Sequence, residues 1–161
     1  MSGAPTVPPP RGRYFEDFTV GEVLLTGRRT ITSTDIVNFA CLSGDFNDVH
    51  TNHEYARTTP FGEPIAHGPL VFAVAAGLNY ASGINDGTLI ALMGIDKWRM
   101  KVPVKHGDTI HVQTTVLEKK ESSSRPEAGI VIFDRKFMNQ RGEVAQEMLV
   151  TIMYRRRAAS D

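Results

Sequence analysis

The chain has 161 residues, of which 41% are hydrophobic and 22% are charged, and its formal net charge is zero. These values are typical of one soluble globular domain with a buried core. A balanced charge gives no indication of a nucleic-acid-binding surface. The single cysteine, Cys41, excludes an intrachain disulfide, and the longest apolar run, residues 70–76, is far shorter than the roughly 20 residues of a membrane span. We therefore expect a cytoplasmic protein without a membrane segment or a nucleic-acid partner.

The chain divides into one domain and two tails. Residues 1–12 contain four of the nine prolines and almost no large apolar side chain, which predicts a disordered N-terminal tail. Residues 13–155 form the expected domain, and 156–161 a polar C-terminal tail. The domain opens with a predicted strand over 23–31, followed by a helix that begins after a cap at 32–34 and ends at Gly44.

Loops and a second helix are predicted in the middle of the chain. Residues 45–49 and 58–64 are expected to be loops, and 53–57 a short helical turn that is capped by Asn52. Residues 69–80 predict a helix that is apolar on nearly every side, which indicates burial all round. Pro69 is compatible with the first position of that helix, where its missing N–H is not needed.

The hydrophobic period then changes from helical to two, which predicts strands. The expected strands cover 88–101, 109–118, 130–138 and 144–154. Short connections between them favour an antiparallel sheet. The predicted fold class is therefore α+β, with an antiparallel sheet of about five strands wrapped around one long buried helix, 69–80.

Two side chains with acid–base chemistry lie in the loop after the first helix. Asp45 and His50 are five residues apart, and a carboxyl and an imidazole together can remove one proton while delivering another. Asp45 follows the negative end of a helix, and we expect this position to raise its pKa. The alternative is that Asp45 caps a turn and His50 fills a surface niche.

Gly68 stands at the start of the apolar helix, where the first N–H groups have no acceptor inside the helix. Such a terminus stabilises negative charge, including that on an enolate oxygen next to a thioester carbonyl. Because Pro69 has no N–H, the amides of Gly68 and Leu70 are the candidate donors. The alternative is a Gly-Pro turn that only caps the helix.

The stretch from Leu42 to His50, with Ala56 six places on, resembles the signature of the MaoC-like dehydratases, the R-specific enoyl-CoA hydratase group. The segment 65–68, Ile-Ala-His-Gly, resembles the second block of that family, and the likeness extends over about 14–155. Asp48 stands where the family usually has proline, and Pro69 stands where a larger apolar residue is common. The resemblance implies the hotdog fold, a long antiparallel sheet around one helix, and a homodimer or higher oligomer.

The resemblance also implies roles for individual residues. Asp45 and His50 would be the catalytic pair and Asn47 would orient them. The Gly68 amide would form the oxyanion hole by binding the thioester oxygen. His67 is interpreted as a supporting residue and as the substitute base if His50 faces away; Ser43 and Gly44 complete the supporting set.

The implied activity is that of a lyase, which hydrates trans-2-enoyl-CoA to (R)-3-hydroxyacyl-CoA or catalyses the reverse dehydration. No cofactor is expected beyond the CoA handle of the acyl-CoA substrate. No metal is expected either; the alternative is a site in which His50, His53 and Asp45 are ligands. Two alternatives stay open: a hotdog acyl-CoA thioesterase that uses Asp45 or Glu63, and a non-catalytic acyl-CoA-binding subunit.

Overall fold

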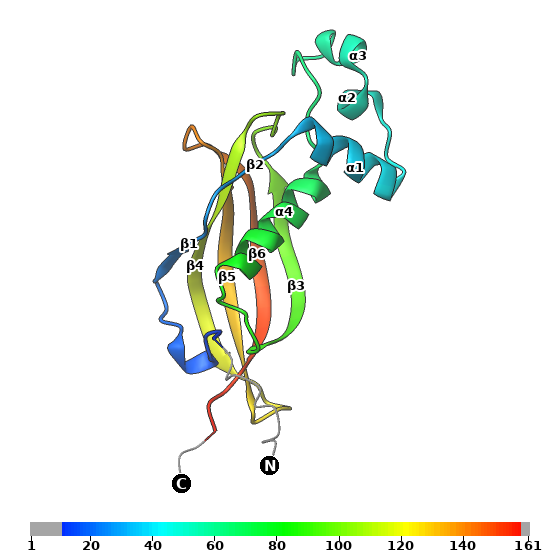
Figure 1. Ribbon diagram of the computed structural model, residues 1–161. Helices are drawn as coiled ribbons and strands as arrows, with labels where there is room; N and C mark the ends of the chain where they lie inside the picture. Colours follow the sequence, from blue (N-terminus) through cyan, green and yellow to red (C-terminus); the bar gives the residue numbers. More distant parts are fainter. Residues whose placement is uncertain (1–10, 159–161) are drawn as a thin grey trace, which may run out of the picture.

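The computed structural model describes residues 11–158 and consists of one antiparallel sheet with a helix across one face (Figure 1). The sheet has the strand order β1-β4-β5-β6-β3, and β2 pairs with β4 beside β1. The strands are β1 (Val23–Leu25), β2 (Arg29–Thr30), β3 (Leu89–Met100), β4 (Thr109–Glu121), β5 (Ala128–Met138) and β6 (Val144–Arg155).

The helical elements are η1 (Phe15–Asp17), α1 (Ser33–Ser43), α2 (Asp48–Thr51), α3 (His53–Arg57) and α4 (Gly68–Ala81). Helix α4 crosses the sheet, whereas α1, α2 and α3 gather beyond one end of it, opposite the end where the two termini lie (Figure 1). The predicted α+β class, with an antiparallel sheet packed on one helix, is confirmed. Among residues 11–158, no helix has the length and hydropathy of a membrane span.

The strand predicted over 23–31 is two strands, so the sheet has six strands rather than five. The interruption lies at Thr26, whose hydroxyl accepts a hydrogen bond from the Val112 N–H at 2.9 Å and donates to the Gly27 carbonyl at 2.8 Å. The Val112 N–H therefore donates to the Thr26 hydroxyl and not to a backbone carbonyl of the neighbouring strand. The strand prediction missed this because such competition depends on a contact with a distant strand.

Helix α4 is buried on one face only. The buried residues are Leu70, Val71, Val74, Ala75 and Asn79, and they pack on the apolar face of the sheet. The opposite face, which includes Ala73, Ala76 and Gly77, is exposed, and Tyr80 is 76% exposed. The expectation of burial on every side is therefore not met in the single chain.

The central strands alternate between buried and more exposed residues as predicted, and two polar side chains also lie on the core-facing side. On β5, Val131, Phe133 and Phe137 are buried, and Arg135 is buried in phase with them. On β6, Gln146 is 3% exposed. Both polar side chains therefore face the layer that α4 covers.

The ends of the described chain are tied to the domain. Residues 1–10 of the expected N-terminal tail and residues 159–161 of the expected C-terminal tail lie outside the described residues. Within the described part, the Gly12 N–H donates to the Asp86 carbonyl at 2.8 Å. Arg157 pairs with Asp17 at 2.8 Å and Arg156 with Glu16 at 3.2 Å, so these two arginines anchor η1 to the last strand.

Candidate active site

Helix α1 precedes the site, and both of its ends are capped. The Thr32 hydroxyl accepts from the Asp35 N–H, which caps the first turn, and Gly44 ends the helix in the left-handed conformation with φ of 77°. The Ser43 hydroxyl donates to the Phe39 carbonyl at 2.7 Å and accepts from the Asp45 N–H at 3.2 Å. A left-handed residue without a Cβ penalty is what this helix end requires, as the sequence predicted.

The Asp45 side chain is organised by Asn47. Its Oδ1 atom accepts hydrogen bonds from the Asn47 side-chain amide at 2.6 Å and from the Asn47 N–H at 3.3 Å. The backbone N–H of Asn47, followed by its side-chain amide and the nearby rings of His50 and His67, holds the pKa of Asp45 below its usual value. The expected rise in this pKa is wrong, because donors to the carboxylate outweigh the small loss of solvation of a side chain that is 40% exposed.

His50 lies on α2, a turn of helix where the sequence predicted loop up to residue 49. Its Nδ1 atom is 2.8 Å from the Ile65 carbonyl oxygen, and since a carbonyl can only accept, Nδ1 carries a proton. The Nε2 atom therefore faces Asp45, with 4.0 Å between Nε2 and Oδ2. A water about 2.8 Å from both atoms fits that separation.

His67 is the third member of the cluster and is 1% exposed. Its ring stacks on that of His50, with centroids 3.8 Å apart and an interplanar angle of 28°. Its Nε2 atom donates to the Asp45 carbonyl at 2.9 Å. Its Nδ1 atom has no hydrogen-bond partner within residues 11–158. His67 therefore fixes both the backbone of Asp45 and the plane of His50.

Asp45, His50 and His67 offer ligand atoms within 4.8 Å of one another, which is compatible in spacing with a metal ion. His53, which the sequence suggested as a ligand, is not a member of this group. The Nδ1 of His67, unpartnered within residues 11–158, keeps a lone pair, but Nε2 carries the proton that it donates to the Asp45 carbonyl. A nitrogen in that state has no free lone pair for coordination.

Gly68 is the first residue of α4, and its carbonyl accepts from the Gln146 side-chain amide at 2.9 Å. Its N–H has no acceptor inside the helix. A Cβ on this residue would lie 2.6 Å from the terminal methyl of Met100. A side chain at this position would therefore have to displace the end of Met100, which lines the same cavity.

A cavity of about 300 Å³ joins Gly68 to His50, since both residues line it. Most of its remaining lining is apolar, from Phe61, Ile65, Ala66, Val71, Met100, Val102, Pro103, Val104 and Ala145. His50 thus contacts this apolar cavity on one side and lies 4.0 Å from Asp45 on the other. The geometry therefore places a carboxylate 4.0 Å from an imidazole, and that imidazole and the first residue of α4 line one largely apolar cavity.

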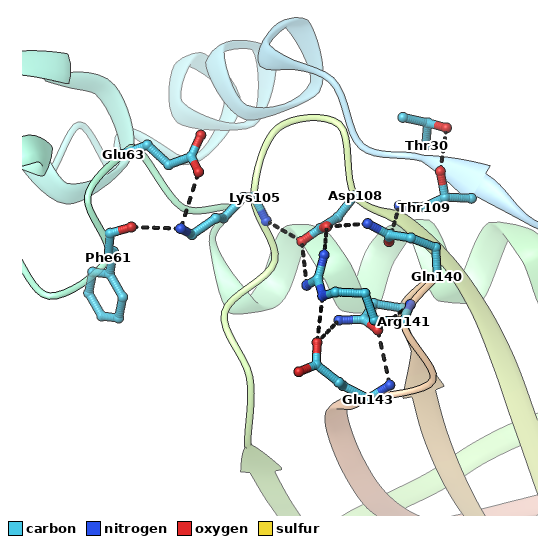
Figure 2. Close-up of polar contacts among 10 residues, drawn as sticks. Thr30, Phe61, Glu63, Lys105, Asp108, Thr109, Gln140, Arg141 and Glu143 are labelled. Atoms are coloured by element: carbon cyan, nitrogen blue, oxygen red, sulfur yellow. Dashed lines mark hydrogen bonds and ion pairs between the residues drawn. The ribbon is translucent and has the colours of Figure 1, made fainter.

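Lys105 contacts the loop that carries Phe61 and Glu63 (Figure 2), and Phe61 lines this cavity. Its ammonium group donates to the Phe61 carbonyl at 2.6 Å and pairs with Glu63 at 3.1 Å. Asp108 fixes the turn that carries Lys105, because its carboxylate accepts from the Lys105 N–H at 3.0 Å and from Arg141 at 2.7 Å. The loop over 58–64 is therefore anchored to the sheet through charged contacts.

Sequence reasoning missed Gln146, Lys105 and the Ile65 carbonyl. Gln146 had a signal, because it is a polar residue in phase with the apolar positions of its strand. Lys105 and the carbonyl had none, since their roles depend only on where the loop folds back. His106 has a structural role: its Nδ1 accepts from the Ser33 N–H at 2.9 Å and so caps α1.

Residues 17–131 match the model of the MaoC-like domain. The chain belongs to the MaoC-like dehydratase family. It is 43% identical to Protein MaoC of Klebsiella aerogenes over 116 residues, which are 72% of this chain but only 34% of that protein. It is also 33% identical to an (R)-specific enoyl-CoA hydratase of Rhodospirillum rubrum over 140 residues, 87% of this chain and 90% of the relative.

Solved structures agree with this membership. The unliganded R-hydratase PhaJ1 from Pseudomonas aeruginosa superposes with a TM-score of 0.70 at 31% identity, covering 89% of this chain and 86% of that one. A Mycobacterium tuberculosis protein with a double hotdog fold gives a TM-score of 0.80 over 93% of this chain and 46% of its own. At 18% identity that likeness shows the fold alone. The fold is the hotdog, as the resemblance implied.

Proposed function

We propose that this MaoC-like domain is a lyase that adds water to trans-2-enoyl-CoA to give (R)-3-hydroxyacyl-CoA, or catalyses the reverse dehydration. The observation that carries the proposal is the placement of His50, which lies 4.0 Å from the Asp45 carboxylate and lines the same apolar cavity as Gly68. The named activity of the Rhodospirillum rubrum relative supports the reaction class.

In the proposed mechanism the water lies between Asp45 and His50. Because the pKa of Asp45 is lowered, its carboxylate is ionised at neutral pH and accepts a proton as the water oxygen bonds to C3 of the enoyl group. His50, in its protonated form, delivers a proton to C2. The proton gained by Asp45 then returns to His50 across the gap between them, which restores the starting state.

Negative charge develops on the thioester oxygen while C3 is attacked. The Gly68 N–H is the proposed donor to that oxygen, since it begins α4 and has no acceptor within the helix. Gln146 supports this amide, because its hydrogen bond to the Gly68 carbonyl holds the first turn in place. The apolar lining of the cavity receives the acyl chain and excludes bulk water.

The direct test follows the ultraviolet absorbance of crotonyl-CoA, which falls when the conjugated double bond is hydrated. We expect Asp45→Asn and His50→Ala each to reduce kcat by about 10²–10⁴-fold, the typical contribution of an acid–base group. Asp48→Asn and His53→Ala are matched controls on the same segment. Full activity of both site variants would remove the pair from the mechanism.

The same assay separates the two alternative functions. Release of free CoA thiol without loss of the double bond would identify a thioesterase. Tight binding of CoA esters without turnover at any chain length would identify a non-catalytic subunit. Glu63, the second candidate thioesterase carboxylate, is paired with Lys105, and this pairing favours a structural role for it.

We also propose that the protein forms a homodimer through β3 and the uncovered face of α4. Strand β3 is an edge of the sheet, and Leu92 and Met93 on it are each about half exposed. Two antiparallel copies of such an edge can extend one sheet across a two-fold axis. Analytical ultracentrifugation should show a dimer that Leu92→Lys weakens and Val20→Lys does not; a monomer at all concentrations would contradict this.

The cytoplasmic location stays a prediction.

A further inference from the structure

Arg135 is a cation in an apolar layer, far in sequence from the Asp45 cluster. It is 9% exposed and lies on β5 between Phe133 and Phe137, on the side that packs against α4. Its guanidinium carbon lies 5.5 Å from the centre of the Phe133 ring. A charged side chain in such a position is rare unless another group compensates its charge.

No such group is found within residues 11–158. Arg135 makes no ion pair and no hydrogen bond with another described residue, and its Nε–H is buried without an acceptor. Its neighbour on β4, Thr114, has a buried hydroxyl that is also without a partner. Burial lowers the pKa of the Arg135 guanidinium, but an arginine keeps its proton in proteins. The fold therefore holds a positive charge and unused donors together.

A small cavity lies at this cation. Its volume is about 20 Å³, and its lining combines Arg135, Thr114, Asn79 and Ser82 with Leu24, Leu25, Thr26, Ile84 and Phe133. One particle the size of a water molecule occupies roughly 10–15 Å³. The cavity is therefore large enough for a monatomic anion or for the carboxylate end of a small acid. It shares no residue with the cavity at His50.

The cavity adjoins a larger hollow on the surface. A larger hollow of about 540 Å³ shares Leu24, Leu25, Ser82 and Ile84 with it. The two arginines of this outer hollow already have partners, since Arg11 pairs with Asp86 at 2.9 Å and Arg13 with Glu22 at 2.8 Å. Among the described residues that line these two hollows, Arg135 is therefore the cation without an ion-pair partner.

We propose that the cavity binds one small monovalent anion against the Arg135 guanidinium, with the Thr114 hydroxyl as a second donor. A water molecule fits the space but leaves the charge uncompensated, whereas an anion satisfies both the donors and the charge. Free chloride and the carboxylate of a short organic acid share this chemistry. The bound anion would fix β4 and β5 beneath Asn79, in the C-terminal half of α4.

The test measures unfolding by urea in buffers of equal ionic strength that contain chloride, formate or gluconate as the sodium salt. Gluconate is too large for the cavity and serves as the reference. A bound anion at ten times its Kd lowers the unfolding equilibrium constant about elevenfold. Stabilisation by chloride identifies a halide site, and stabilisation by formate alone identifies a carboxylate site. Equal stability in all three salts would overturn the proposal.

Variants separate this site from a general effect of salt. Arg135→Met is expected to fold, because an apolar side chain of similar length replaces an unpaired buried charge, and to lose the anion dependence. Lys136→Met, the matched control on the opposite face of β5, should keep it. Thr114→Val should raise the Kd for the anion several-fold without unfolding the protein. Anion dependence that persists in Arg135→Met would contradict the assignment.

A crystal soaked in sodium bromide gives a second, independent measurement. Bromide scatters anomalously, so an anomalous peak within hydrogen-bond distance of the Arg135 guanidinium is expected. A cavity that contains only water both in this crystal and in one soaked in sodium formate would refute the proposal. Neither measurement depends on hydratase activity, so the outcome is independent of the proposed reaction.

Discussion

His67 should control activity through a single hydrogen bond, and two substitutions can isolate that bond. The Nε2 atom of His67 donates to the Asp45 carbonyl at 2.9 Å from a side chain that is 1% exposed. Glutamine can place its amide nitrogen near the position of Nε2, whereas asparagine is too short to reach the carbonyl. Both remove the ring that stacks on His50, so the comparison between them isolates the hydrogen bond.

The magnitude follows from the burial of this contact. A hydrogen bond of this kind contributes about 1 kcal/mol net, and its loss leaves a carbonyl unsatisfied, which brings the cost to about 1–2 kcal/mol. For a domain of this size the difference in Tm between His67→Asn and His67→Gln is then roughly 3–6 °C. Because a displacement of Asp45 by 1 Å can cost about 10²-fold, we expect kcat of His67→Asn to be about 10–100-fold below that of His67→Gln.

Thermal unfolding and steady-state kinetics with crotonyl-CoA check both numbers. KM should change little between the two variants, because His67 does not line the cavity at Gly68. His53→Asn, on the exposed surface of α3, is the control and should leave kcat unchanged. Equal kcat in His67→Asn and His67→Gln, or a difference confined to KM, would refute the positioning role.

Three further predictions follow. Burial raises the pKa of Asp108, but hydrogen bonds from Arg141, the Lys105 N–H and Gln140 outweigh it, so the net pKa is lowered. The ionised carboxylate therefore stabilises the fold. Its contribution is complete above the ordinary pKa of 3.8 and is lost as pH falls through the lower pKa of the folded state. Asp108→Asn should therefore cost about 1–2 kcal/mol at pH 7, less than for a fully buried pair because Arg141 is 47% exposed. The variant should also flatten the dependence of stability on pH below the ordinary pKa of 3.8, which urea unfolding at several pH values measures; an unchanged profile would contradict this. Gly68→Ala should lower kcat/KM about tenfold, because the displaced end of Met100 would misplace groups near the reacting atoms. Stability should be unchanged, since the new Cβ displaces only the flexible end of that side chain. If the double variant Gly68→Ala/Met100→Ala recovered no activity, displacement of Met100 would be excluded as the cause. Dialysis against EDTA should leave activity intact, because Nε2 of His67 is occupied as a donor; a loss that zinc reverses would show a metal site.

Local signals predicted the frame of the site. Gly44 ends α1 in a left-handed conformation and Asn52 caps α3, and both features depend on residues only a few positions apart. The limits of the main strands followed from alternation in the same way. The prediction was wrong where a distant group intervened, as at Thr26, which splits a strand by bonding to Val112. The pKa of Asp45 was predicted in the wrong direction because the donors of Asn47, though close in sequence, depend on how the loop folds.

The sequence by itself determined most of the helices and strands, the apolar character of α4 and the motif in which Asp45 and His50 are five residues apart. Hydrophobic periodicity and helix caps depend on residues within one or two helical turns, so they can be predicted without knowledge of the fold. Only the tertiary structure decided which groups face one another: His67 reaches the Asp45 backbone across 22 positions, and Gln146 reaches the Gly68 carbonyl across 78. It also placed Arg135 in an apolar layer without a partner among the described residues. The energy of a polar group depends on its solvation and on the charges around it, and in a folded chain both are set by residues far away in the sequence.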